Sequence, residues 1–330
     1  MNDRYHDRFR RRPDRSGFGA PFRPSRRTDP GARPQGSRQN ESARSFLSKV
    51  SVDPSPRICL EKGSRELTMR AMDLLCPLGR GQRGLIVAPP TCGKTTLLKH
   101  LCQAITQAEP SMKVYCLLID ERPEEVTDFK RTVKADVRWS SVDQPYENHV
   151  RVADELMNQV YREADGGADV MILLDSLTRL ARVHNTGTRG QGRTLSGGVD
   201  ARGLEVPRRI FGSARKIENG GSLGILATVL VETGSRMDDV IFQEFKGTGN
   251  MEIVLSREIA SRRIYPAVHV GDTGTRKEEL LMTPEEKEGT RKLRAGLAGM
   301  SPPEAARTFV GLLEKFPTNG ELLKALKAQV

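Results

Sequence analysis

The stretch GLIVAPPTCGKTT, residues 84–96, decides the fold of this chain. It begins with apolar, strand-forming residues, continues as a tight loop, and is followed by leucines at helical spacing. A phosphate-binding loop needs this order: Gly93 lets backbone N–H groups approach phosphates, Lys94 adds a charge, and Thr95 can hold Mg²⁺. The usual pattern starts with glycine, and this chain has Ala88 there. Taken alone, the match is incomplete, and an ordinary strand-turn-helix remains the alternative.

The composition is that of a soluble α/β protein. The chain has 330 residues, of which 37% are hydrophobic, enough for one large core or two modest ones. Its five cysteines form no CxxC pair and have no metal-ligand spacing with the histidines, so we expect neither a disulfide framework nor a zinc site. No apolar run of about 18 residues and no secretory signal is present, which predicts a cytoplasmic protein without a membrane span.

Most of the basic excess lies at the N-terminus. Residues 1–45 hold 12 arginines, no lysine and five acidic residues, a net charge of +7 out of +11 for the whole chain. Their few apolar side chains cannot offset the entropy of ordering, so we predict a disordered arm. Arginine interleaved with aromatics favours contact with nucleic acid. The alternative is a plain solubilising tail.

After the arm, strand and helix patterns alternate. The expected strands are 84–88, 114–120, 169–175, 223–231 and 251–256, and the expected helices are 94–108, 122–134, 147–163 and 200–217. Near-continuous apolar strands separated by helices predict a mostly parallel sheet covered on both faces. Ligands of such sheets bind outside the carboxyl ends of the strands.

The chain divides into four predicted segments: the arm 1–45, a lead-in 46–83, a motor domain 84–283 and a C-terminal helical subdomain 284–330. The lead-in has a possible strand near residue 58 and a helical pattern from 67 to 75. Prolines at 284, 302 and 303 are typical of helix starts. We assign packing, and no chemistry, to the last segment.

Two strand ends carry carboxylates. Asp175 ends an apolar strand about 80 residues after the phosphate loop and can orient Mg²⁺. Glu121 ends another strand and is our candidate for polarising the water that attacks the γ-phosphate. Glu124 and Glu125 follow Pro123, and for these two the first turn of a helix is the simpler interpretation.

Two polar, glycine-bearing segments separate regular elements. Residues 184–198 have too little apolar content to pack, and a loop of that length is usually functional or disordered. Arg189 and Arg193 in it suit a phosphodiester backbone. The second segment is 232–238, after an apolar strand. Both could line one channel.

Taken together, these motifs resemble the ATPase motor domain of the Rho family of transcription termination factors, which are RecA-like ring helicases. The resemblance covers residues from about 46 to 283. It rests on GRGQRGLIVAPP (79–90), DERPEEVT (120–127), LLDSLTRLAR (173–182), GGVD (197–200), EFKGTGNME (244–252) and GTRKEEL (274–280). Ala88 is what this family shows. The implied fold is a RecA-like P-loop NTPase with a mostly parallel twisted sheet flanked by helices and a C-terminal helical subdomain.

The resemblance implies a homohexamer with ATP and Mg²⁺ between subunits. Phosphate and Mg²⁺ contacts would come from Lys94 and Thr95, the metal contact from Asp175, and the attacking water from Glu121. The further residues implied at the nucleotide are Pro90, Thr91, Cys92, Gly93, Thr96 and Arg122. Tyr265 stands at the position where the family usually has an aromatic residue against the adenine. Arg276 resembles an arginine finger that reaches the nucleotide of the neighbouring subunit, and Arg263 resembles a second arginine that bridges two subunits.

The same resemblance implies RNA in the central channel. The two channel loops fall on 184–198 and 232–238, and their RNA contacts would be Arg193, Thr194, Thr233, Gly234 and Arg236. RNA polymerase and elongation factors are further candidate partners. Two departures stand out: the loop has Thr91 and Cys92 where lysine and alanine are usual, and we expect the family's N-terminal OB-fold RNA-binding domain to be missing, with the arm in its place.

Three functions therefore compete. The first is an ATP-dependent RNA translocase or helicase of the Rho type, acting in transcription termination. The second is a RecA-like motor on DNA, which RNA-specific hydroxyl contacts would distinguish. The third is a non-hydrolysing, Rho-associated RNA-binding or regulatory protein. The full hydrolytic set favours the first, because a protein that only binds does not need it.

Overall fold

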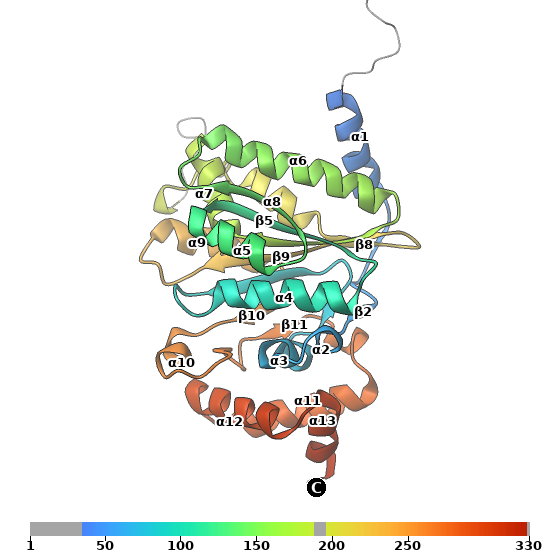
Figure 1. Ribbon diagram of the computed structural model, residues 1–330, viewed down its shortest axis with the longest axis vertical. Coiled ribbons are helices and arrows are strands. Elements are labelled where there is room, and N and C mark those ends of the chain that lie inside the picture. Colours follow the sequence, from blue (N-terminus) through green and yellow to red (C-terminus); the bar gives the residue numbers. More distant parts are fainter. Residues whose placement is uncertain (1–34, 188–195, 329–330) are drawn as a thin grey trace, which may run out of the picture.

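A twisted nine-stranded sheet forms the centre of the computed structural model, which describes residues 35–187 and 196–328 (Figure 1). The main path runs β11-β10-β4-β9-β7-β5-β6, and β8 joins β1 to β9. The six strands from β10 to β6 pair in parallel, while β11, β8 and β1 are antiparallel. The strand bounds are β1 Ser51–Val52, β4 Arg83–Ala88, β5 Lys113–Glu121, β6 Asp136–Ser141, β7 Asp169–Asp175, β8 Arg215–Ile217, β9 Ser222–Leu230, β10 Met251–Val254 and β11 Gly274–Thr275, with a small separate sheet of β2 Arg57–Ile58 and β3 Leu78–Gly79.

Helices cover both faces of this sheet (Figure 1). One face packs against α1 Gln35–Ser48, α6 Tyr146–Asp165, α7 Leu177–Gly187, α8 Glu205–Gly212 and α9 Arg236–Lys246. The other packs against α2 Leu60–Gly63, α3 Leu67–Leu75, α4 Lys94–Ala108, α5 Pro123–Thr132, α10 Arg257–Ser261, α11 Pro284–Leu297, α12 Pro302–Lys315 and α13 Asn319–Ala328. The predicted doubly covered, mostly parallel sheet is confirmed.

The central strand β4 explains why the strands are apolar without alternation. Successive side chains of a strand point to opposite faces. Leu85 and Val87 therefore enter the core beneath α6, whereas Ile86 and Ala88 enter the core that α4 covers. Both faces are buried, so both sets must be apolar.

Some expected elements are wrong. The strand β6 was not predicted, because it lies at the sheet edge and is only half-buried, so its sequence DVRWSS is largely polar. The expected helix 200–217 is shorter: α8 covers Glu205–Gly212, and Arg215–Ile217 form β8. The arm 1–45 is helical from Gln35 onward, because Phe46 is buried against Tyr161 of α6. Residues 1–34 lie outside the described residues.

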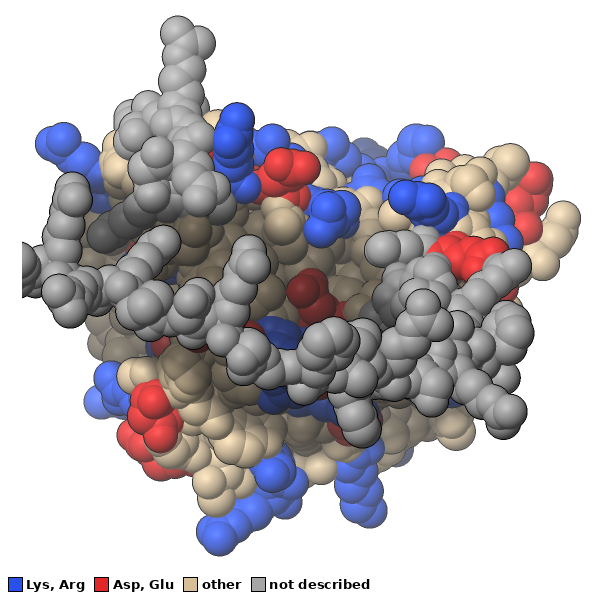
Figure 2. All heavy atoms as spheres, turned by 90° about the horizontal axis from the view of Figure 1, so that it is seen from above, with Lys and Arg blue, Asp and Glu red and all other residues tan. Residues whose placement is uncertain are grey.

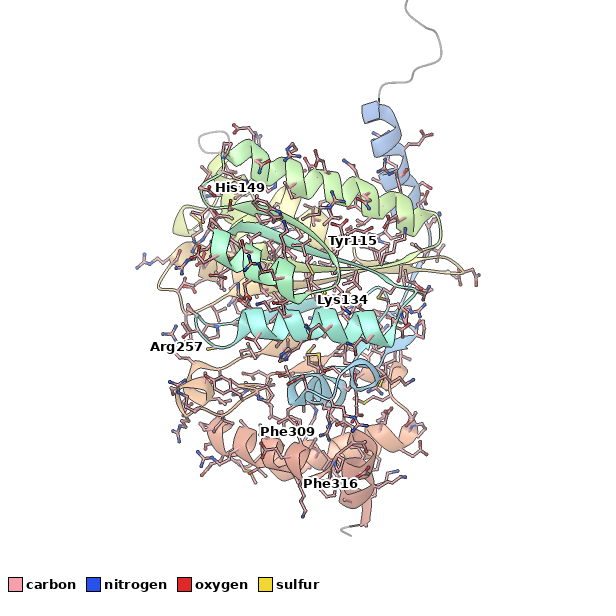
Figure 3. The ribbon with its side chains drawn as sticks, in the orientation of Figure 1. Tyr115, Lys134, His149, Arg257, Phe309 and Phe316 are labelled. Atoms are coloured by element: carbon pink, nitrogen blue, oxygen red, sulfur yellow. The ribbon has the colours of Figure 1, made fainter. Side chains whose placement is uncertain are left out.

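The C-terminal helices begin where proline predicts. Pro284 is the first residue of α11, and Thr283 and Glu286 exchange backbone and side-chain bonds of 2.9 and 3.2 Å as a capping box. Phe309 of α12 is fully buried, and Phe316 packs at the edge of the same core (Figure 3). This core also holds α3 and α4, so the helices extend one hydrophobic core; the domain division stays a prediction. No helix among the described residues is long and apolar enough to cross a membrane.

Candidate nucleotide site

The phosphate loop lies at the carboxyl end of β4. Its chain turns through two residues with positive φ, Thr91 at 67° and Gly93 at 91°. Gly93 takes this left-handed conformation without a steric penalty, and α4 starts directly after it at Lys94. The free N–H groups of the first helical turn therefore face the loop, as anion binding requires.

Three predicted residues meet beside this loop. Lys94 Nζ forms a short ion pair with Asp175 Oδ1 and lies 3.6 Å from Glu121 Oε1. Asp175 is also held by Thr228, whose hydroxyl donates to Oδ1 at 2.8 Å. The three side chains come from neighbouring elements because β7 pairs with β5 and lies beside β9, the partner of β4. The lysine thus sits between two carboxylates.

The Glu121 carboxylate is the unusual group of the site. It is buried, and neither of its oxygens has a hydrogen-bond partner among the described residues. Burial and the charge of Asp175 raise the pKa of Glu121 to about 7, against the opposing pull of Lys94 and Arg179. For Lys94, burial lowers the pKa, but Asp175 and Glu121 outweigh it and the pKa is raised. A carboxylate that ionises near neutral pH is suited to act as a general base.

A bulge at the end of β5 aims Glu121 into the site. The register between β5 and β6 shifts between Ile119 and Glu121, and Asp120 between them has a φ of 57°. Arg179 of α7 holds this turn, donating to the Asp120 carbonyl while its Nε lies 3.2 Å from Glu121 Oε1. The role of Arg179 is not among the predictions from the sequence. Arg179 lies four residues after Asp175, about one helical turn further along the chain. This spacing was the signal in the sequence that could have placed it near the site.

The loop borders a cavity of about 490 Å³. Its lining unites most of the predicted phosphate contacts with the candidate base; the lining residues are Pro89, Pro90, Thr91, Gly93, Lys94, Thr95, Thr96, Glu121, Arg122, Glu125, Arg179 and Leu230. The cavity therefore has a cationic and N–H-rich floor and one buried carboxylate wall.

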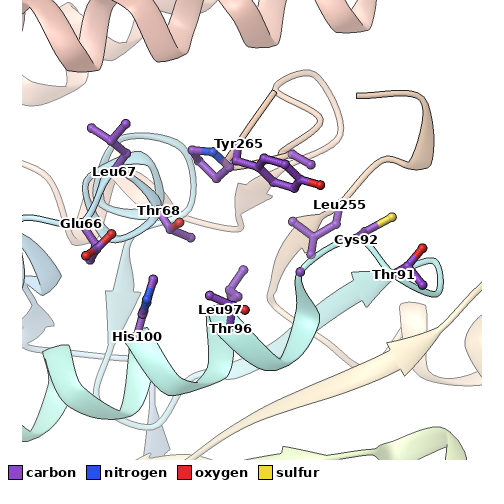
Figure 4. A pocket seen from close by; sticks show the side chains of 13 residues that line it. Glu66, Leu67, Thr68, Thr91, Cys92, Thr96, Leu97, His100, Leu255 and Tyr265 are labelled. Atoms are coloured by element: carbon purple, nitrogen blue, oxygen red, sulfur yellow. The ribbon is translucent and has the colours of Figure 1, made fainter. Parts of the chain in front are cut away.

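A second cavity of about 440 Å³ lies on the other side of the loop (Figure 4). Tyr265, which is 47% exposed, forms one wall, with Leu97 and Leu255 below it. Glu66 and His100 form the opposite, polar end, which the sequence did not reveal. An apolar slot with an aromatic wall and a few polar groups is what a nucleoside needs.

Cys92, the unusual loop residue, faces this second cavity but is only 2% exposed. Its thiol donates to the Pro90 carbonyl at 3.7 Å, and burial raises its pKa. Thr91 donates to the same carbonyl at 2.6 Å. Both side chains therefore bond within the loop itself, and the buried Cys92 packs as a small apolar residue.

The donor set fits Mg²⁺ together with a phosphate, and fits poorly a metal held by protein alone. Among the described residues, no group of three or more His, Cys, Asp or Glu side chains is arranged to hold an ion. Thr95 and Asp175 offer one hydroxyl and one carboxylate beside the cavity. Mg²⁺ is usually bound by one or two protein oxygens plus substrate phosphates.

Arg276 does not join this site. It follows β11, its backbone N–H donates to the Asn250 carbonyl at 2.9 Å, and it lines a shallow pocket around Asn250 and Glu252. Since Met251 pairs with Gly84 at the beginning of β4, Arg276 lies at the amino end of the strand whose carboxyl end carries the loop. Arg263 is exposed and stands two residues before Tyr265, but it is not among the residues that line the second cavity.

The predicted RNA residues are only partly described. Arg193 and Thr194 lie outside the described residues. The helix α7 continues through Gly187, so the first loop is shorter than 184–198, and Arg236 begins α9. Gly197 packs so closely on Arg236 that an added Cβ would come within 2.8 Å of its carbonyl oxygen. The two segments are therefore neighbours.

Thr233 and Gly234 complete the second segment. The Thr233 hydroxyl donates to Asp238 at 2.6 Å, and Asp238 also pairs with Arg182 of α7. Gly234 has a φ of 77°. Figure 2, a view from above, shows both basic and acidic side chains around the edges of the visible face.

Comparison with known proteins agrees with this geometry. Residues 68–274 match the nucleotide-binding domain model of the ATP synthase alpha/beta family. An ATPase of the type III secretion system of pathogenic bacteria superposes with a TM-score of 0.68 at 23% identity over 86% of each chain. The assembled ATPase EscN of enteropathogenic E. coli gives 0.67 at 23% identity, over 86% of this chain and 73% of that one. At such identity the likeness shows the fold alone, and together with the family match it identifies the chain as a RecA-like phosphate-loop protein.

Its closer relatives narrow the class. The chain is 48% identical over 285 residues to transcription termination factor Rho of Haemophilus influenzae, covering 86% of this chain and 68% of that protein. Rho of Aquifex aeolicus is 50% identical over 285 residues, with 86% and 65% covered. Rho of Karelsulcia muelleri is 47% identical, with 86% and 75% covered. The chain belongs to the Rho family.

Proposed function

We propose that this chain is an RNA-dependent ATPase that translocates on and unwinds RNA as a homohexameric ring, and that it acts in transcription termination. The proposal rests on one observation above all. Lys94 and Glu121 line the cavity at the carboxyl end of β4, and Lys94 also pairs with the buried Asp175, while the candidate finger Arg276 lies at the amino end of β4. A hydrolytic site of this kind is completed by a second copy of the chain.

In this proposal Lys94 exchanges its partner. Without nucleotide it pairs with Asp175, and on binding it turns to the phosphate oxygens. Asp175 and Thr95 would then hold Mg²⁺, which supplies charge neutralisation at the phosphates. Tyr265 supports the base in the cavity on the other side of the loop. Nucleotide binding therefore reorganises the ion pairs at the end of β7.

Glu121 acts as the base. Its carboxylate, which accepts no hydrogen bond among the described residues, takes a proton from the attacking water, and its raised pKa makes that transfer favourable near neutral pH. Arg179 and the bulge at Asp120 hold it in place. Arg276 of the next subunit stabilises the charge of the transition state, an effect worth about 10³–10⁵ in rate in other NTPases.

RNA contact is assigned to the segment that follows α7 and to the segment that follows β9. The proposed residues are Arg193, Thr194, Thr233, Gly234 and Arg236. The second segment follows β9, whose last residue Leu230 lines the phosphate cavity. A change at the nucleotide can therefore reach these residues through one short connection.

The direct test is ATP turnover with single-stranded RNA, with single-stranded DNA of the same sequence, and without nucleic acid. The proposal expects stimulation by RNA well above that by DNA. Equal stimulation by RNA and DNA would favour a motor on DNA. Turnover no higher than the background of a Lys94→Ala control, under all three conditions, would favour a binding or regulatory protein.

A further inference from the structure

Three arginines gather at the amino end of β4. Arg83 is the first residue of β4, Arg215 the first of β8, and Arg276 follows β11. The sheet order brings them together, since β8 pairs with β9 and both β9 and β10 flank β4. This place is remote from the phosphate loop, at the opposite end of the same strand.

Two of the guanidinium groups are held by neutral carbonyls. Arg83 donates from Nε to Thr248 and from Nη1 to Ala214, both at 3.0 Å. Arg215 donates from Nε to Ser213 at 3.1 Å and from Nη1 to Leu47 at 3.0 Å. These bonds orient the two side chains without neutralising their charge, and each guanidinium keeps further N–H donors.

Their charges are uncompensated. Within residues 35–187 and 196–328, no carboxylate forms an ion pair with Arg83, Arg215 or Arg276. Other arginines of the lead-in differ: Arg57 pairs with Asp73 and Glu286, and Arg80 with Glu109 and Asp169. Uncompensated like charges repel, so a cluster of them is stabilised by a bound anion.

The pKa of Arg83 also reflects a cluster of uncompensated positive charges. Burial, together with repulsion from Arg215 and Arg276, lowers the pKa of Arg83. Glu252 lies close enough to Arg276 for their charges to interact, yet it forms no ion pair with it. The cluster therefore keeps an excess of positive charge.

A cavity of about 380 Å³ opens in front of Arg83 and Arg215. Its remaining walls are Ser51, Val52, Asp53, Pro54, Gly81 and Asn250. Asp53 does not neutralise the arginines, because its carboxylate binds Lys277 Nζ at 2.9 and 3.0 Å. The lining is thus a pair of fixed guanidinium groups with room for a ligand.

We propose that this cavity, the arginine pocket, binds a phosphate-type oxyanion between Arg83 and Arg215. Guanidinium groups match the oxygens of such an ion with paired N–H donors. The source is either free inorganic phosphate or the terminal phosphate of a nucleotide. The site goes beyond the proposed ATPase function and does not depend on it.

The test is calorimetric titration with sodium phosphate and, separately, with ADP, at constant ionic strength. Protein carrying Lys94→Ala is used, so that the phosphate loop contributes little. Arg215→Gln and Arg83→Gln are added singly, with Arg131→Gln of α5 as the matched control for loss of one exposed arginine. Arg215→Lys keeps the positive charge. Its unfolding midpoint, measured in chloride buffer without phosphate and compared with that of the parent, checks that the fold persists.

We expect phosphate binding that is about 10–100-fold weaker in Arg215→Gln and Arg83→Gln and unchanged in Arg131→Gln. An arginine-dependent isotherm with phosphate alone identifies free phosphate as the source, and one with ADP identifies a nucleotide; either supports the site. The proposed site is overturned if Arg83→Gln and Arg215→Gln both leave the affinity for phosphate and ADP unchanged. It is also overturned if the folded protein binds neither ligand. The readout involves no ATP turnover, so its failure leaves the proposed function untouched.

Discussion

The two ends of β4 differ in whether their charged side chains form ion pairs. At the carboxyl end, Lys94 lies between the carboxylates of Asp175 and Glu121. At the amino end, Arg83 and Arg276 share one neighbourhood, and neither pairs with a carboxylate of the described chain. The first end holds a balanced set that a nucleotide must rearrange, while the second offers positive charge to something outside the subunit.

This difference teaches why a single chain is an incomplete enzyme in our proposal. A candidate base, a phosphate loop and a metal-binding carboxylate meet at one end, and the candidate finger lies at the other. In a ring, each interface would bring the amino end of one subunit to the carboxyl end of the next. The following experiments test each end in turn.

Removing the cation at the carboxyl end has the largest expected effect. Lys94→Ala should abolish ATP turnover, because the phosphates lose their point charge and Asp175 is left with an uncompensated buried charge. A steady-state ATPase assay measures this, and size-exclusion chromatography should show that assembly persists. Lys99→Ala, one turn further along α4 and paired with Asp128, is the control. Residual turnover at the parent rate would refute the site.

Removing the arginine at the amino end comes next. Arg276→Ala should lower kcat by about 10³–10⁵ if it acts as a finger in trans. Doped into parent rings, the variant should depress activity beyond its own fraction. Arg307→Ala, which removes an exposed arginine of α12, serves as the control. A loss strictly proportional to the fraction of variant would argue that each subunit works alone.

The base should matter somewhat less. Glu121→Gln keeps the shape of the side chain but cannot accept a proton, so kcat should fall by about 10²–10⁴ while nucleotide affinity is kept. Single-turnover hydrolysis and fluorescent-nucleotide binding separate the two effects. Glu124→Gln, which alters an exposed carboxylate two residues after Arg122, controls for charge. A loss of affinity with unchanged kcat would remove Glu121 from its assigned role.

Tyr265→Ala should weaken nucleotide binding by about 1–3 kcal/mol, the usual worth of stacking a base on an aromatic ring. Tyr265→Phe keeps the ring and should bind as the parent does, since a base stacks on the ring and does not need the hydroxyl. Equilibrium binding of ADP measures both. Equal losses in the two variants would show that the hydroxyl, not the ring, makes the contact.

The pH dependence should be the smallest effect. Glu121 must be ionised to act as a base, and its pKa is raised to about 7. The ratio kcat/KM should therefore be full above this pH and fall by about ten-fold per unit well below it. Glu121→Gln should lose this limb. A profile that stays flat from pH 8 to pH 5 would contradict a raised pKa in the free enzyme.

Sequence patterns predicted the elements that are buried on both faces. The strand 169–175 has the predicted limits because its apolar run is continuous. The helix 94–108 has them because Leu97, Leu101 and Ile105 recur at helical spacing on its buried face. The edge strand β6 and the helix α9 were missed because they are half-exposed and carry mixed polar sequences. The helix α7 was missed although it is mostly buried, because some of its buried side chains are polar, such as Thr178, His184 and Asn185. The positions of these elements depend on how the strands are ordered in the sheet, which local sequence patterns do not show.

The candidate site was predictable where one residue carries one chemical role. Lys94, Glu121 and Asp175 each stand at the end of a recognisable strand. Arg179 and Arg215 were not found, because their roles depend on the bulge at Asp120 and on the order of strands in the sheet. Such contacts arise between elements far apart in the sequence, and local patterns do not contain them.

The central claim is that one active site is built from two copies of the chain. Mixing Lys94→Ala subunits with Arg276→Ala subunits tests it most directly, because each variant alone is expected to be inactive. The account predicts that the mixture recovers RNA-stimulated ATP hydrolysis, since an interface that takes Lys94 from one variant and Arg276 from the other is intact. A mixture that stays as inactive as its components at every ratio, in rings shown to contain both, would contradict it.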